Sequence, residues 1–223
     1  MSTKRVVLKD RILPFYTKGE EIFNMVSHIV GGAVGVITLV LCVVISAFNG
    51  KTVGVLCGAM FGLSMITLYT MSSIYHGLRR NTAKKVFQIM DHCSIYFLIA
   101  GTYTPILVCS VAKDYPLAAW GTFALVWGTA ILAMTLNAID LKKYKSFSMI
   151  CYIAMGWAVV FSIPQTYRSL GHKGFMLVLL GGLFYTFGVY FFSVKKRYFH
   201  SVFHIFTVIG SLCHSMAVIF YVM

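Results

Sequence analysis

Charged residues are scarce in this sequence, and acidic ones especially so. Only 6 of the 223 residues are Asp or Glu, charged residues make up 11%, and apolar residues make up 59%. A soluble domain of this size carries roughly a quarter charged residues. Together with a mean hydropathy of +0.82, the low charge excludes an ordinary soluble domain and predicts an integral membrane protein.

The sequence also lacks the patterns of two other protein classes. Its six cysteines form no CxxC pair and all fall within apolar segments, so we interpret them as small packing residues rather than a disulfide framework. The formal net charge of +13 comes from short basic clusters between apolar runs, with no basic surface interleaved with aromatic residues. Nucleic acid is therefore not an expected partner, and the clusters favour loops that face anionic lipid.

Seven apolar segments follow one another along the chain, each of about 18–28 residues and so long enough to cross a hydrocarbon core. They cover residues 21–48, 53–76, 86–112, 115–138, 146–163, 174–194 and 199–223. The sequence therefore predicts an all-α fold with seven transmembrane helices in one membrane domain, residues 21–223. The preceding residues 1–20 are expected to form a cytoplasmic or interfacial segment.

The distribution of Lys and Arg predicts how these segments are oriented. Fifteen of these residues fall on the side of the N-terminus: five before the first segment, four in the second connection, and three each in the fourth and sixth. The other four fall on the opposite side. Because Lys and Arg concentrate in cytoplasmic loops, the N-terminus is expected in the cytoplasm and the C-terminus outside.

Three histidines at one depth of the membrane predict a metal site. His200 and His204 are four residues apart, which places them on one face of a helix about 6 Å from each other. His76 ends the second segment on the same side of the membrane. Three neutral imidazoles with a fourth position open are typical of a catalytic zinc site. We therefore expect His76, His200 and His204 to bind Zn²⁺.

Further polar residues fall in the same layer, within roughly 10 Å of the cytoplasmic boundary. Asp91 is the candidate to orient or deprotonate a water on the metal. Ser72, one helical turn from the first histidine ligand, could orient that ring or bind an oxygen atom. Glu21, Asn24 and His28 share one face of the first segment and are candidates for contacts around the metal ligands.

Packing roles are the alternative for each of these residues. A single intramembrane histidine is often a hydrogen-bonding residue between helices, and Asp91 could be neutral or paired with a loop arginine. His92 points about 100° away from Asp91, so it is a weaker candidate for contact with the site. His214 lies about 15 Å along the helix from His204, too far for the same ion, and a packing or relay role is expected.

Four motifs in order resemble those of the haemolysin III family, the bacterial branch related to the progestin and adipoQ receptors in the CREST superfamily. They are EIFNMVSH at 21–28, SSIYH at 72–76, Asp91, and HSVFH at 200–204. The stretch AGTYTP at 100–105 is similar to the bacterial branch, and the resemblance covers essentially the whole chain. It implies seven helices, a cytoplasmic N-terminus, zinc on the three histidines, Asp91 near the water on zinc, and a bacterial plasma membrane.

Two functions follow as hypotheses. The first is a zinc-dependent hydrolase of a lipid amide or ester in the cytoplasmic leaflet, with membrane lipids as partners. The second is a non-enzymatic regulator or sensor of membrane homeostasis or fluidity, in which zinc is structural. Pore formation fits less well, because a chain with seven permanent spans has no evident soluble form. Transport is not indicated, because no broken helix or midplane acidic pair is recognisable.

Overall fold

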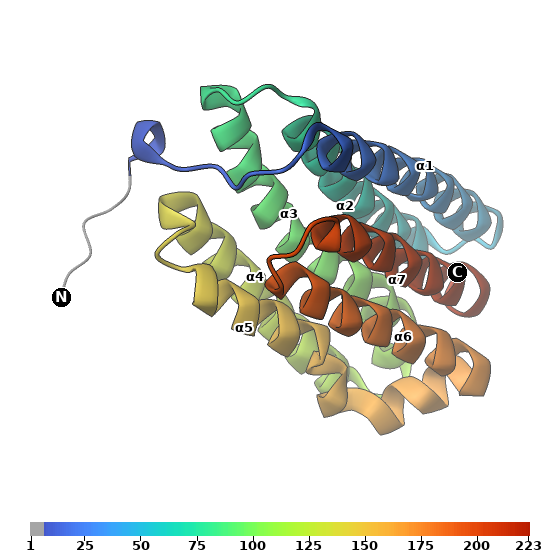
Figure 1. The fold of residues 1–223 in the computed structure, drawn as a ribbon. Helices are drawn as coiled ribbons and strands as arrows, with labels where there is room; N and C mark the ends of the chain where they lie inside the picture. Colours follow the sequence, from blue (N-terminus) through green and yellow to red (C-terminus); the bar gives the residue numbers. More distant parts are fainter. Residues whose placement is uncertain (1–6) are drawn as a thin grey trace.

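A computed structural model describes residues 7–223, which form helices and no strand in that range. The main helices pack side by side in one bundle (Figure 1). They are α1 (Lys18–Phe48), α2 (Thr52–Gly77), α3 (Thr82–Pro105), α4 (Pro116–Asp140), α5 (Lys145–Gly156), α6 (Ile163–Ser193) and α7 (Phe199–Tyr221). Short helical turns occupy η1 (Leu8–Asp10), η2 (Ile106–Ser110), η3 (Val111–Lys113) and η4 (Ala158–Ser162). The all-α prediction is confirmed; residues 1–6 of the predicted N-terminal segment lie outside the described part.

The first helix begins at a capping box that also connects it to the last helix. Thr17 accepts a hydrogen bond from the Glu20 backbone N–H, and the Glu20 carboxylate accepts one from the Thr17 backbone N–H at 2.8 Å. These bonds satisfy backbone donors that a helix start leaves free. The second Glu20 oxygen accepts from the Tyr198 backbone N–H at 2.7 Å, just before α7. The starts of α1 and α7 therefore lie together.

The ends of α1 and α7 also lie together, so the two helices run parallel. Asn49 and Lys51, which follow α1, both donate to the backbone oxygen of Met223. The beginning of α1 and the end of α7 consequently lie at opposite ends of the bundle, as Figure 1 shows. A chain that starts at one end of a bundle and finishes at the other crosses it an odd number of times.

Within residues 7–223, six helical segments are long and apolar enough to cross a membrane. Four of them contain α1, α2, α4 and α7, and a fifth combines α3 with η2 and η3. The sixth is the 49-residue segment Lys145–Ser193, which covers the fifth predicted span and all but the last residue of the sixth. Gly171 interrupts the helical backbone of this segment with φ 68° and ψ 175°. The multi-pass membrane class is confirmed, whereas the count of seven and the orientation stay predictions.

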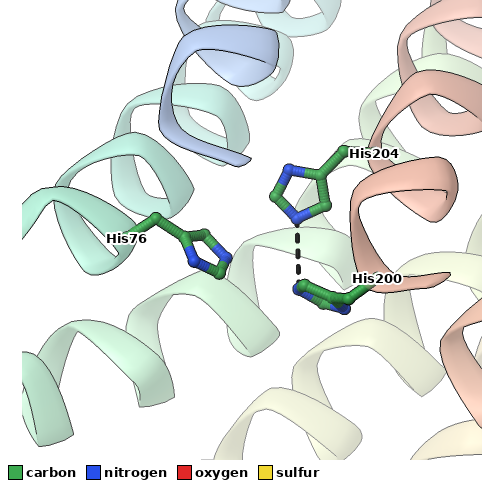
Figure 2. Close-up of side chains that lie close together, drawn as sticks. All are labelled: His76, His200 and His204. Carbon is green, nitrogen blue, oxygen red and sulfur yellow. Dashed lines mark hydrogen bonds between the residues drawn. The ribbon is translucent and has the colours of Figure 1, made fainter. Parts of the chain in front are cut away.

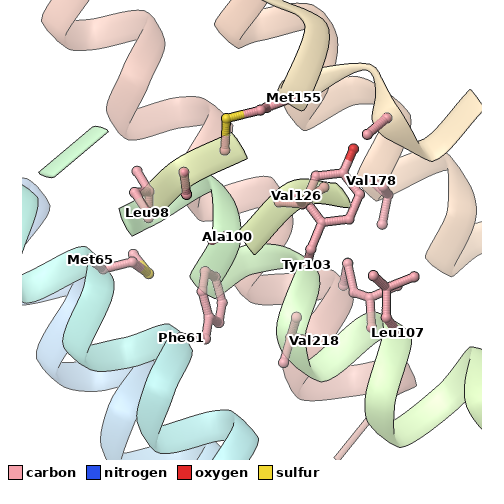
Figure 3. Close-up of a cluster of buried hydrophobic side chains, with 14 of the residues drawn as sticks. Phe61, Met65, Leu98, Ala100, Tyr103, Leu107, Val126, Met155, Val178 and Val218 are labelled. Carbon is pink, nitrogen blue, oxygen red and sulfur yellow. The ribbon is translucent and has the colours of Figure 1, made fainter. Parts of the chain in front are cut away.

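The helices pack around a shared apolar core. Figure 3 shows Phe61 and Met65 of α2 near Leu98 of α3, with Leu107 and Val218 further along the same cluster. Pro105 ends the α-helical geometry of α3, and the chain continues as the π-helical turn η2. Ile106 and Leu107 of this irregular stretch belong to the core and to the wall of the cavity described below.

Replacing Gly62 by alanine is expected to destabilise the protein. A Cβ atom at this position would lie 2.6 Å from Leu39 Cα, so α1 and α2 would have to separate. Overpacking of this kind costs about 1–3 kcal/mol. Thermal unfolding in detergent should show a lower midpoint for Gly62→Ala. Gly121→Ala in α4 is the matched control, since nothing lies within 4 Å of a Cβ there; equal midpoints for both variants would contradict the expectation.

Candidate metal centre

His76, His200 and His204 lie close together although two helices far apart in sequence carry them. His76 stands in the last turn of α2, and the two others stand in the first turns of α7 (Figure 2). One ligand atom of each residue lies within 4.8 Å of the corresponding atoms of the other two. The Nε2 atoms of His200 and His204 are 3.2 Å apart. Nitrogens of a tetrahedral zinc site with bonds of about 2.0–2.1 Å are roughly 3.4 Å apart, so the cluster has suitable dimensions.

Hydrogen bonds decide which histidine nitrogens face the centre of this cluster. His76 Nδ1 lies 2.7 Å from a Glu21 carboxylate oxygen, and His204 Nδ1 lies 3.2 Å from the Asn24 backbone oxygen. Because both oxygens are acceptors, each Nδ1 carries the hydrogen and each Nε2 presents a lone pair. His76 Nε2 is buried and has no hydrogen-bond partner among the described residues. An orphaned lone pair of this kind fits a metal, and carboxylate or carbonyl partners of this type commonly orient metal-binding histidines.

Lys84 is a part of the site that the sequence analysis missed. Its side chain is 1% exposed, and its Nζ lies 2.8 Å from the second Glu21 oxygen. It also donates to the backbone oxygens of His76 and Leu78 at 3.3 and 3.0 Å. Buried charges are tolerated when they are paired and hydrogen-bonded. The ion pair fixes the Glu21 carboxylate, which in turn fixes the His76 ring.

The carboxylate of Glu21 is expected to matter for zinc affinity. Glu21→Gln should weaken zinc binding about 10–100-fold, because the neutral amide orients the His76 ring less firmly and makes it less basic. Competition with a chromophoric chelator measures this affinity. Glu21→Gln also leaves Lys84 without its ion-pair partner, so the double variant Glu21→Gln/Lys84→Met serves as the control. Unchanged affinity in both variants would contradict the assigned role.

Asn24 and His28 complete the contacts that α1 makes with the cluster. The Asn24 side-chain oxygen accepts from Ser201 Oγ at 2.7 Å, which links α1 to α7. The His28 ring stacks on His204 with centroids 3.6 Å apart and an interplanar angle of 14°. Both nitrogens of His28 are buried without a hydrogen-bond partner among the described residues. The predicted polar face of the first helix therefore does lie against the histidines.

Asp91 and Ser72 lie beside each other at the edge of the cluster. The Ser72 hydroxyl neighbours the Asp91 carboxyl without a hydrogen bond of normal geometry, and it has no other partner among the described residues. His92 Nδ1 donates to the Gln88 backbone oxygen at 2.8 Å and lies 3.8 Å from an Asp91 oxygen. His92 is thus nearer to Asp91 than the helical angle predicted. The described ion pairs give Asp91 no arginine partner.

Tyr16 covers the histidine cluster and was also missed from sequence. Its ring stacks on His200 at 5.0 Å and 24° and meets His76 edge-on at 5.6 Å. Arg80 holds this part of the chain through hydrogen bonds of 3.0 Å to the backbone oxygens of Leu13 and Pro14. Burial, with the nearby charges of Asp91 and Glu21, raises the pKa of the Tyr16 phenol above its ordinary value. The phenol is therefore a neutral cover over the site.

A narrow apolar cavity leads away from the histidines. Its volume is about 160 Å³, and its polar end includes His28, Ser72, Asp91, His200 and His204. Apolar side chains of α3, η2, α5, η4, α6 and α7 form most of the remaining wall. On α7 the lining extends from His200 to His214, which is roughly 21 Å along a helix. The cavity is thus long, with four ionisable side chains, those of His28, Asp91, His200 and His204, together at one end.

Comparison with known proteins agrees with the motifs. The haemolysin-III related family matches residues 16–215. The chain belongs to this family. Hemolysin-3 of Bacillus cereus is 34% identical over 205 residues, covering 92% of each chain. The Hemolysin-3 homolog of Bacillus subtilis (strain 168) is 33% identical over 207 residues, covering 92% of this chain and 96% of the relative. Human monocyte to macrophage differentiation factor is 26% identical over 169 residues, covering 71% and 67%. The family resemblance is confirmed; metal binding by this haemolysin III-related chain stays a prediction.

Proposed function

We propose that this chain is a zinc-dependent membrane hydrolase that cleaves a lipid amide or ester at the cytoplasmic leaflet. One observation carries the proposal: two imidazoles of the three-histidine cluster, His200 and His204, line a long apolar cavity whose wall also holds Asp91 and Ser72. A polar reaction site at the mouth of an apolar passage fits a substrate with a carbonyl head and a hydrocarbon chain.

Each polar residue has a role in this proposal. His76, His200 and His204 would hold Zn²⁺, with Glu21 and the Asn24 backbone orienting two of the rings. Zinc held by three histidines supplies a Lewis acid that polarises a carbonyl and makes water nucleophilic near neutral pH. Asp91 accepts the proton of the attacking water and returns it to the leaving amine or alcohol. The unpartnered Ser72 hydroxyl donates to the substrate oxygen.

Seven spans with a cytoplasmic N-terminus form part of the proposal. The segment Lys145–Ser193 has 49 residues, about 74 Å if it were one straight helix and more than twice a hydrocarbon core of about 30 Å. The break at Gly171 allows it to cross twice. Parallel α1 and α7 require an odd number of crossings. The excess of Lys and Arg beside the histidine end supports placing that end in the cytoplasm, and the Bacillus relatives support a bacterial plasma membrane.

The direct test is turnover by purified protein. Zinc-loaded protein in lipid nanodiscs, incubated with a panel of lipid amides and esters, should release fatty acid that mass spectrometry detects. Stripping the metal with a chelator should stop the release, and adding zinc back should restore it. No release from any substrate class by folded, zinc-loaded protein would contradict the hydrolase.

A regulatory role with structural zinc is the second candidate. It is favoured by the way the three histidines connect α2 with α7, while Glu21 and Asn24 add α1 to the same contact. Zinc would then stabilise the arrangement of three helices that respond to the surrounding lipid. In this case Asp91→Asn leaves the effect of the protein on membrane fluidity intact, whereas His204→Ala abolishes it. Fluorescence anisotropy of a membrane dye in deletion cells carrying each variant distinguishes the two functions.

A further inference from the structure

His214 carries an unpartnered hydrogen-bond acceptor in the wall of the apolar cavity, far from the histidine cluster. The residue is 8% exposed and belongs to the cavity wall. Its Nε2 lies 3.0 Å from the Val178 backbone oxygen, an acceptor, so Nε2 carries the hydrogen. Its Nδ1 therefore presents a lone pair, and this atom is buried without a partner among the described residues. A buried acceptor left without a donor is costly, and such atoms usually have a partner.

The surrounding residues hold His214 in this position. Gly181 leaves room for the Nε2 edge of the ring, which any side chain at that position would overlap. The Tyr185 ring contacts the imidazole with centroids 5.4 Å apart. The Tyr185 hydroxyl shares Ser211 Oγ with Tyr69, at 2.7 and 2.6 Å. His214 thus stands in a small polar patch inside an otherwise apolar wall, and the patch lacks one donor.

We propose that this patch is a binding subsite for a hydroxyl group on the hydrocarbon chain of the ligand, with His214 Nδ1 accepting the hydroxyl hydrogen. The inference rests on the proposed function in one respect, because that function places the carbonyl head beside His200 and His204. The Tyr185 ring bounds the subsite beside the imidazole. The ligand class is therefore a hydroxylated acyl lipid rather than a plain acyl lipid.

The position of the hydroxyl follows from the helix. His214 is ten residues beyond His204, which is about 15 Å along α7. Extended C–C bonds of about 1.5 Å advance a chain by roughly 1.3 Å per carbon, so about twelve carbons cover this distance. A hydroxyl close to the carbonyl head, for instance on carbon three, would remain at the histidine end and would not reach the subsite.

Binding of free fatty acids tests this assignment without requiring turnover. The probes are octadecanoic acid and its derivatives hydroxylated on carbon twelve or carbon three, competing with a fluorescent fatty acid for wild-type protein in nanodiscs. The acid hydroxylated on carbon twelve should bind about tenfold more tightly than the other two, equivalent to about 1.4 kcal/mol. A satisfied buried acceptor is worth an amount of this order.

Two variants locate the effect at His214. His214→Leu removes the acceptor, so this variant should bind all three acids with equal affinity. Gly181→Ala should displace the His214 ring and also give equal affinities. This second variant keeps the test decisive if His214→Leu does not fold. Leu212→Ala, an exposed position on the same helix, should keep the preference.

Several outcomes would overturn the subsite: equal binding of all three acids to wild type, no binding of any of them, or a preference that survives His214→Leu. Lipid hydrolysis without the preference would overturn the subsite and leave the hydrolase standing. The preference without any hydrolysis would support the subsite and contradict the hydrolase.

Discussion

Asp91→Asn should reduce kcat for lipid hydrolysis by about 10²–10⁴-fold, the range in which general acid–base groups contribute. Asparagine has almost the same size as aspartate but cannot accept the proton of the attacking water. Asp91 lines the cavity together with His200 and His204. It is not one of the three residues that could hold the metal ion. The substitution should therefore leave zinc content unchanged. Rates from released fatty acid, normalised to bound zinc, give the comparison.

Controls separate this loss from a general disturbance of the cavity. Ser72→Ala removes one hydrogen bond to the substrate and should cost much less than the loss of Asp91. Ile99→Val changes an apolar lining residue of α3, two turns beyond Asp91. It removes one methylene far from the reacting groups, so its typical cost of about 0.5–1.5 kcal/mol falls on the free energy of unfolding and kcat should stay within about threefold. Full activity of zinc-loaded Asp91→Asn would exclude Asp91 as the proton acceptor and favour the regulatory function.

His204→Ala should lower zinc affinity by at least about a hundredfold, because loss of orienting partners alone costs 10–100-fold and this change removes a ligand itself. His204 is 1% exposed, packs on His28 and lies beside His200. Hydrolysis should disappear with the metal. Metal analysis after dialysis against a zinc buffer, with circular dichroism to verify folding, measures the effect.

His172→Ala is the matched control for the loss of a histidine. His172 lies in α6 away from the cluster and is exposed, so this variant should keep wild-type zinc affinity. Retention of zinc by folded His204→Ala would mean that other residues hold the metal. A similar loss in both variants would show that the effect is not specific to the cluster.

The cluster of His76, His200 and His204 could be predicted because it follows from residue spacing and from the order of the apolar segments. The spacing of His200 and His204 places them on one helix face, and the alternation of spans brings the end of the second segment, with His76, to the same membrane layer as these two residues. Glu21, Asn24 and His28 followed from the same helical periodicity. The structure adds what each atom contacts, such as the bond from His76 to Glu21 that frees Nε2.

Lys84 and Tyr16 could not be predicted because their roles depend on contacts between distant segments. Lys84 was counted with the loop cations, since nothing near it in sequence shows that Glu21 from another helix buries it as an ion pair. Tyr16 precedes the first apolar segment. Its contact with His200 depends on how the residues before α1 pack against the start of α7, which the sequence does not show. The start of α6 was also missed. The sequence placed residues 164–173 in a connection, whereas α6 begins at Ile163 and its backbone breaks at Gly171, within that predicted connection.

Zinc K-edge X-ray absorption on purified wild-type protein tests the central claim most directly. The account predicts one zinc per chain with three nitrogen ligands at about 2.0–2.1 Å and an oxygen in the fourth position. The imidazole signal should decline in His76→Ala and His200→Ala. Protein purified without chelators that contains no zinc, or a spectrum dominated by sulfur ligands, would contradict a three-histidine zinc centre and the hydrolase built on it.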